Sequence, residues 1–125
     1  MLTDTTTIAG KEITLAYCYA TEIAYKELTD TDIADFIPTI EQVFKTNRPP
    51  DIKATTSLIM SAHMAYMQSK GKDTADDITF NDFVCDATPT EIATALGKVL
   101  VLYAKFYHIP LGEPADKPDA SEKNS

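Results

Sequence analysis

Residues 5–19 read TTTIAGKEITLAYCY, in which two stretches rich in β-forming residues lie on either side of an Ala-Gly-Lys sequence. Gly10 can adopt the positive φ that a tight turn requires. If the second stretch is extended, Ile13, Leu15 and Tyr17 share one face, because successive side chains of a strand alternate. The pattern predicts a β-hairpin, or at least one strand. A helix that begins early within YCYATEIAYKEL remains an alternative for the end of this stretch.

Beyond residue 20 the spacing of apolar residues changes from that of a strand to that of a helix. Thr21 is expected to cap a short helix, and Thr29 or Asp30 is expected to cap a second one. Pro38 interrupts the second pattern, since proline lacks an N–H and clashes with the preceding turn. It either kinks this helix or starts a separate one that runs to residue 44.

Three further helices are predicted in the second half of the chain. A long helix should cover residues 53–70, with Gly71 well placed to end it. Thr79, with Asp82 three residues later, forms a variant of the capping box and predicts a short helix to residue 86. The sequence TPTE at 88–91 combines an N-cap Thr, a Pro at the first helical position and a Glu three residues after the cap. It predicts a last helix to about residue 108.

The chain of 125 residues is long enough for one domain. We expect a mainly α fold, in which a small helical domain with a short N-terminal β-hairpin or strand covers residues 1–109. Residues 110–125 are rich in Pro, Asp, Glu and Ser and almost lack apolar side chains. Such a segment cannot recover its ordering entropy by burial, so a disordered, acidic C-terminal tail is expected there.

Charge and composition narrow the classes of function. The 11 Lys and Arg against 19 Asp and Glu give a formal net charge of -8, and binding to nucleic acid is not expected because it depends on clustered basic residues. MLTDTTTIAG has neither the basic start nor the apolar run of a secretory signal, and no stretch is apolar enough to span a membrane. Cys18 and Cys85 are expected to be free, buried thiols in a reducing cytoplasm, with a disulfide between them as the alternative.

The helix at 53–70 has two apolar faces. Leu58 and Ile59 belong to one arc, and Met60, Met64 and Met67 form a second. Either its neighbours enclose this helix on all sides, or it shows the methionine face to a partner, for which soft and adaptable side chains are suited. In the last helix two apolar residues fall within or beside the polar face. The candidate partner-binding residues are therefore Met60, Met64, Met67, Val101 and Leu102.

The sequence offers no set of residues from which to build a catalytic site. His63 lies among Met and Ala on a helix, as a structural histidine would, and His108 suits the C-terminus of the last helix. The acidic clusters at 30–35 and 73–77 lack the spacing of a calcium loop and are better explained as caps and solvated charges. We therefore expect no enzyme, no cofactor and no bound metal.

The order of these features resembles that of tail assembly chaperones of long-tailed bacteriophages. The likeness runs from about residue 10 to residue 107, and the segment around Pro38 departs from the family's layout. It is one of layout and residue character and rests on five consecutive segments: TEIAYKELT at 21–29, DIADFI at 32–37, TTSLIMSAHMAYMQSKGK at 55–72, DDITFNDFVCDATP at 76–89 and TEIATALGKVLVLYAKFY at 90–107.

The resemblance implies a function and partners. Proteins of this family are made in the cytoplasm of the bacterial host and are absent from the mature virion. They bind the tape measure protein, keep it soluble and help to recruit tail tube subunits, and many also exist as a longer product of ribosomal frameshifting. We thus expect the tape measure and tail tube proteins as partners, with homo-oligomers possible. The alternatives are another small helical protein-binding module or a head–tail structural component of a phage.

Overall fold

A β-hairpin opens the chain, as the sequence predicts. In the computed structural model, which describes residues 1–46, 51–72, 79 and 81–110, β1 (Leu2–Ile8) pairs antiparallel with β2 (Lys11–Tyr17). The two turn residues, Ala9 and Gly10, have φ values of 53° and 78°. Two consecutive positive φ values are typical of a type I′ turn, whose twist matches that of the strands it joins. Ile13, Leu15 and Tyr17 are all buried on the inner face.

The first helix, α1 (Tyr19–Thr29), begins earlier than the predicted cap at Thr21. Cys18 occupies the N-cap position, and Thr21 lies in the first turn, where its hydroxyl accepts from Cys18 N at 3.2 Å and donates to Ala16 O at 2.8 Å. The alternative of an early helix start is therefore correct. The buried threonine fastens the end of β2 to the beginning of α1.

The second helix, α2 (Ile33–Thr46), is continuous and contains Pro38 within it. The prediction of a separate helix starting at the proline is therefore wrong. Ile33, Phe36 and Ile40 are buried, and their spacing places them along one face of the helix. This apolar face holds α2 against the rest of the molecule although one backbone donor is missing.

The long helix α3 (Ile52–Ser69) lies at the centre of the fold. Asp51 caps it by accepting from Ala54 N at 3.1 Å. The helix packs against β2, α1 and α4, and its buried residues include Leu58 and Ile59 but also Met67 of the methionine stripe. Of the two interpretations of its apolar faces, the enclosed central helix is the one that this packing supports.

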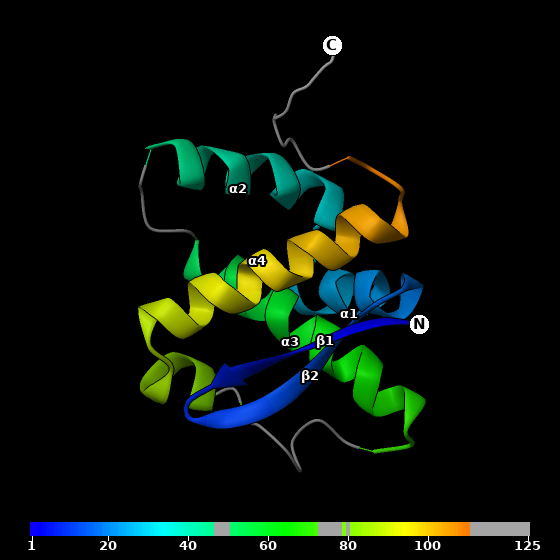
Figure 1. The fold of residues 1–125 in the computed structure, drawn as a ribbon, viewed down its shortest axis with the longest axis vertical. Coiled ribbons are helices and arrows are strands. Elements are labelled where there is room, and N and C mark those ends of the chain that lie inside the picture. Colours follow the sequence, from blue (N-terminus) through cyan, green and yellow to red (C-terminus); the bar gives the residue numbers. More distant parts are fainter. Residues whose placement is uncertain (47–50, 73–78, 80, 111–125) are drawn as a thin grey trace.

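The chain then forms a short π-helix, η2 (Asp82–Asp86), and the last helix, α4 (Pro89–Phe106). The capping box predicted for α4 is present in full, formed by Thr88 and Glu91. Asp82 Oδ2 accepts from Thr79 N at 2.8 Å, but the short helix begins at Asp82 with Asn81 at its N-cap, so the predicted cap at Thr79 is wrong. Figure 1 shows α4 crossing α3, with the hairpin beside both helices. Packing of β1 and β2 against α4, and of β2 against α3, joins the hairpin to the helical core.

The predicted mainly α fold with an N-terminal hairpin is thus confirmed. Side chains from the hairpin and from all the helices share a buried cluster. The predicted disordered tail, apart from Pro110, lies outside the described residues. Across the described part of the chain, no helix combines the length and the apolar character needed to cross a membrane.

Candidate functional site

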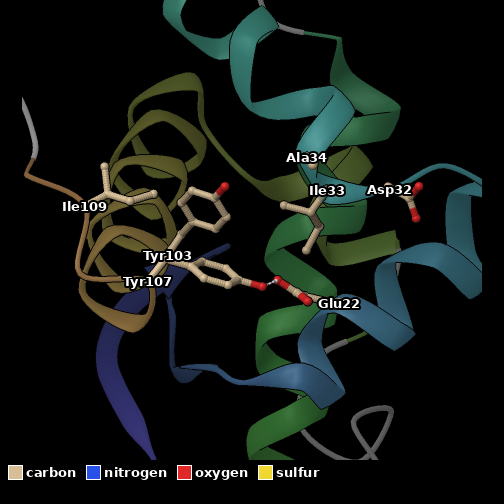
Figure 2. A pocket seen from close by; sticks show the side chains of 7 residues that line it. All are labelled: Glu22, Asp32, Ile33, Ala34, Tyr103, Tyr107 and Ile109. Carbon is tan, nitrogen blue, oxygen red and sulfur yellow. Dashed lines mark hydrogen bonds between the residues drawn. The ribbon is translucent and has the colours of Figure 1, made fainter.

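A groove with a volume of about 600 Å³ lies where the end of α4 approaches α1 and the beginning of α2. Figure 2 shows that Tyr103 and Tyr107 approach it from α4, while Glu22 reaches it from α1 and Ile33 from α2. We call this feature the aromatic groove. Its lining residues are Glu22, Asp32, Ile33, Ala34, Tyr103, Tyr107 and Ile109.

Glu22 is the polar centre of the aromatic groove. Its Oε2 accepts a hydrogen bond from the hydroxyl of Tyr17 at 2.7 Å and another from the hydroxyl of Tyr107. The second bond spans the groove from α4 to α1 (Figure 2). Two hydroxyl donors on one oxygen fix the position of this half-buried carboxylate, so it forms an ordered part of the wall.

The two tyrosine hydroxyls are held in their protonated form. Burial, followed by the hydrogen bond to Glu22, raises the pKa of Tyr17 well above its usual value. The hydrogen bond to Glu22 is the main cause that raises the pKa of Tyr107 to about 12. A phenolate at either position would lose its bond and face the negative carboxylate, which adds to the effect of burial at Tyr17 and is the main effect at Tyr107.

An aromatic cluster packs around the two tyrosines of the groove. The ring of Tyr17, at the end of β2, contacts those of Tyr103 at 5.5 Å, Phe106 at 5.4 Å and Tyr107 at 6.5 Å between centroids. Tyr19, in the first turn of α1, meets Phe106 edge-on at 5.2 Å. Tilted and edge-to-face pairs of this kind stabilise by about 0.5 to 1.5 kcal/mol each beyond area burial. The end of α4 is thereby fixed against the junction of β2 and α1.

Exposed apolar side chains lie on the segments that form the aromatic groove. Tyr19 is 65% exposed and Ile23 is 61% exposed, and their spacing of four residues places them on one face of α1. Tyr107 and Ile109, which line the groove, are 40% and 44% exposed. Large apolar side chains exposed in isolation are normal, but a group around a groove is typical of an interaction surface.

The methionine surface predicted from the sequence is not formed as expected. Met67 is 6% exposed and belongs to the interior, while Met60 and Met64 are half-buried. Met67 follows His63 by one helical turn, on the side of α3 that meets β2, where His63 contacts the backbone. The end of the stripe at Met67 is therefore enclosed and does not face a partner.

The two candidate partner-binding residues on α4 differ in their exposure. Val101 is 39% exposed, as a surface residue should be, whereas Leu102 is 4% exposed. The placement of Leu102 beside the polar face is wrong because α4 packs against α3 as well as both strands. Contact on several sides widens the buried arc beyond the stripe that a single packing partner requires.

The remaining chemistry-bearing residues have structural explanations. His63 is buried, and its Nδ1 lies 2.7 Å from Thr14 O, which can accept but not donate. Cys18 and Cys85 are free, as predicted, but Cys85 is exposed and Cys18 is half-buried, so their expected burial is wrong. In the described residues no three His, Cys, Asp or Glu side chains are placed to share a metal ion. The acidic cluster at 73–77 lies outside the described residues.

Sequence reasoning missed the aromatic groove. The signal present in the sequence was the concentration of aromatic residues at 17–25 and again at 103–107. Periodicity assigned Tyr103, Phe106 and Tyr107 to a core-facing arc, but it did not indicate that Tyr107 would extend past the core to Glu22. Contacts between two segments more than 80 residues apart cannot be obtained from the spacing within either segment.

Comparison of the chain with protein-family models, with curated proteins and with solved structures finds no match.

Proposed function

We propose that this chain is a tail assembly chaperone of a long-tailed bacteriophage, which binds the tape measure protein and keeps it soluble while tail tube subunits assemble around it. The observation that carries the proposal is the aromatic groove with its exposed apolar border. The layout of the sequence, described above, supplies the choice of partner. The tail tube protein is the second proposed partner.

The border of the groove suits an apolar helical segment. Recognition of this kind places the apolar face of a helix along a groove, with anchor residues spaced by three or four positions. Ile33 and Ala34 from α2, and Tyr107 and Ile109 from the end of α4 and beyond it, line the groove with apolar groups. Tyr19 and Ile23 add exposed apolar surface on α1, the helix that carries Glu22. Val101 is exposed on α4 but does not line the groove. Met67 and Leu102, which the core requires, are no longer proposed as contacts.

The acidity of the chain fits the work of a holding protein. A net charge of -8 on 125 residues keeps molecules apart by mutual repulsion. A complex between this chain and an aggregation-prone partner would share that repulsion. The proposed site of action is the cytoplasm of the bacterial host, and we propose that the mature virion lacks the protein.

Co-expression with the tape measure protein of the same phage tests the proposal. With the wild-type chain, the tape measure protein should remain in the soluble fraction and co-purify. The double variant Tyr19→Ser, Ile23→Ser should lose the partner while its circular dichroism stays helical, because both side chains are mostly exposed. Ile52→Ser is the matched control, since Ile52 is similarly exposed, at 56%, but lies on α3 and not on α1.

Two results would overturn the proposal. One is a tape measure protein that stays insoluble, or does not co-purify, in the presence of the wild-type chain. The other is the detection of the chain in purified particles by mass spectrometry at the copy number of a structural component. Retained binding by the double variant, with loss in the Ile52→Ser control, would move the binding surface away from the groove.

A further inference from the structure

The aromatic groove combines apolar walls with a carboxylate, and this combination points to the chemistry of its occupant. We propose that the groove receives an arginine side chain carried by the apolar helical segment of the partner. The inference rests on the proposed function and specifies what the partner must present. Glu22 pairs with the guanidinium, and the rings of Tyr103 and Tyr107 pack against it.

The charge of the groove is complementary to such a group. Glu22 and Asp32 line it, and none of the residues that line it is basic. Lys26 pairs with Asp32 at 3.5 Å, but both side chains are more than half exposed, and surface pairs of this kind contribute little. Figure 2 places Asp32 beyond Ile33 from the tyrosines, so Glu22 carries the charge at the centre.

Glu22 is prepared to accept a further hydrogen bond. The hydroxyls of Tyr17 and Tyr107 both donate to Oε2, and among the described residues Oε1 has no donor. The position of the carboxylate is already fixed, so a guanidinium that binds it loses little additional side-chain entropy. A charge-assisted N–H to carboxylate bond is about twice as strong as a neutral one.

The tyrosine rings favour arginine over other groups. The centroids of Tyr103 and Tyr107 are 5.2 Å apart with an interplanar angle of 61°, so the two rings offer differently inclined surfaces beside the carboxylate. A planar guanidinium can stack on one ring face and still direct an N–H to Glu22. Ile33 and Ala34 at the opposite wall suit the aliphatic part of the same side chain.

A set of helical peptides tests the inference without a variant of the protein. Three peptides of about 18 residues share one apolar face and differ at one central position of that face, which holds arginine, its neutral isostere citrulline, or glutamate. Binding is followed by the amide signals of Ala34 and Ile109 in ¹H–¹⁵N spectra. The arginine peptide should bind on the order of tenfold more tightly than the citrulline peptide, the ratio that one charged hydrogen bond supplies. The glutamate peptide should bind more weakly than either.

Two variants locate the effect. Glu22→Gln retains an acceptor for the tyrosine hydroxyls but removes the charge, and it should abolish the preference for arginine over citrulline. Glu27→Gln changes an exposed carboxylate on the same helix and should preserve the preference. Equal affinity for the arginine and citrulline peptides would overturn the inference while leaving the chaperone proposal intact. If no peptide binds and the tape measure protein does not co-purify, the proposed function itself fails.

Discussion

Thr5 and Thr14 face each other across the hairpin, and the carbonyl oxygen of each is covered by a side chain from a different helix. Thr14 O meets His63 Nδ1 of α3 at 2.7 Å, and Thr5 O accepts from Lys98 Nζ of α4 at 2.5 Å. A two-stranded sheet has two edges, and unpaired backbone groups on an edge invite pairing with another chain. Here α3 and α4 each cover one edge.

His63→Leu should lower the free energy of unfolding by about 1 to 3 kcal/mol, because the carbonyl of the half-buried Thr14 loses its donor. Urea denaturation at neutral pH measures this change. Lys98→Met should cost less, since the bond it removes lies at an exposed position. The reverse order of the two losses would contradict the assignment of His63 as the donor to Thr14.

Because of Glu91, the stability of the protein should decrease at acidic pH. Its carboxylate accepts backbone N–H groups from Thr88 at 2.9 Å, Ala9 at 3.0 Å and Gly10 at 3.2 Å, and these bonds, that of Thr88 foremost, lower its pKa. The unfolded state, with the ordinary pKa near 4.5, binds protons first as the pH falls. Stability is therefore fully present above this value and declines below it. Urea midpoints at pH 6, 4 and 3 should decrease, and Glu91→Gln should flatten the decrease.

Ala9→Asn should stabilise the fold by up to about 1 kcal/mol. Ala9 has a φ of 53°, which an alanine adopts at a cost and which asparagine tolerates better. The change would produce the Asn-Gly pair that two-residue hairpin turns favour. Thermal unfolding compares the variant with wild type, and Thr7→Asn on exposed β1 serves as a control that should bring no gain. A lower midpoint for Ala9→Asn would contradict this account of the turn.

Met67→Ala should destabilise the protein by about 2 to 5 kcal/mol, the usual range for truncating a buried methionine. Met64→Ala should cost clearly less because Met64 is half-buried. Guanidinium denaturation of the two variants provides the comparison. Equal losses of unfolding free energy in the two variants would argue against the enclosed packing of α3. If a Met67 variant loses a binding partner, the cause is therefore its reduced stability and not the removal of a contact.

Tyr107 should ionise at a pH near 12, whereas an ordinary tyrosine does so near 10. In Glu22→Gln its pKa should fall towards the ordinary value, because the bond that mainly raises it loses a charged acceptor. Since the folded pKa lies above the unfolded one, this group's contribution to stability is present below pH 10 and is lost between about 10 and 12. Absorbance near 295 nm, with Tyr107→Phe to assign the transition, follows the titration.

The features that the sequence predicts well are those determined by residues close together in the chain. The alternation of Ile13, Leu15 and Tyr17 defines the inner face of the hairpin, and Thr88 with Glu91 defines the start of α4. The errors lie where distant segments meet. Leu102 is buried because α4 has several packing partners, and Met67 because α3 lies at the centre of the fold, packed against β2, α1 and α4.

The candidate site could not be predicted for the same reason. In the sequence, Glu22 is an ordinary acidic residue in the first turn of a helix, where its negative charge interacts favourably with the helix dipole. Its role in the aromatic groove appears once Tyr107, 85 residues later, donates to it. Helix propensities and the helix dipole explain why Glu22 is favourable in α1, but the approach of the end of α4 to α1 determines which side chains Glu22 contacts.

The triple acceptance by Glu91 has a consequence for the order of events during synthesis. The hairpin turn is made first by the ribosome, yet the carboxylate that holds Ala9 is 82 residues away, and the lysine that covers Thr5 is 93 residues away. Such long-range contacts slow folding because the intervening chain must be ordered before they form. The nascent hairpin therefore emerges with both edges uncovered. The edge at Thr14 stays open until His63 of α3 has been synthesised, and the edge at Thr5 stays open until Lys98 of α4 follows. Until then, its backbone groups can pair with those of other nascent chains.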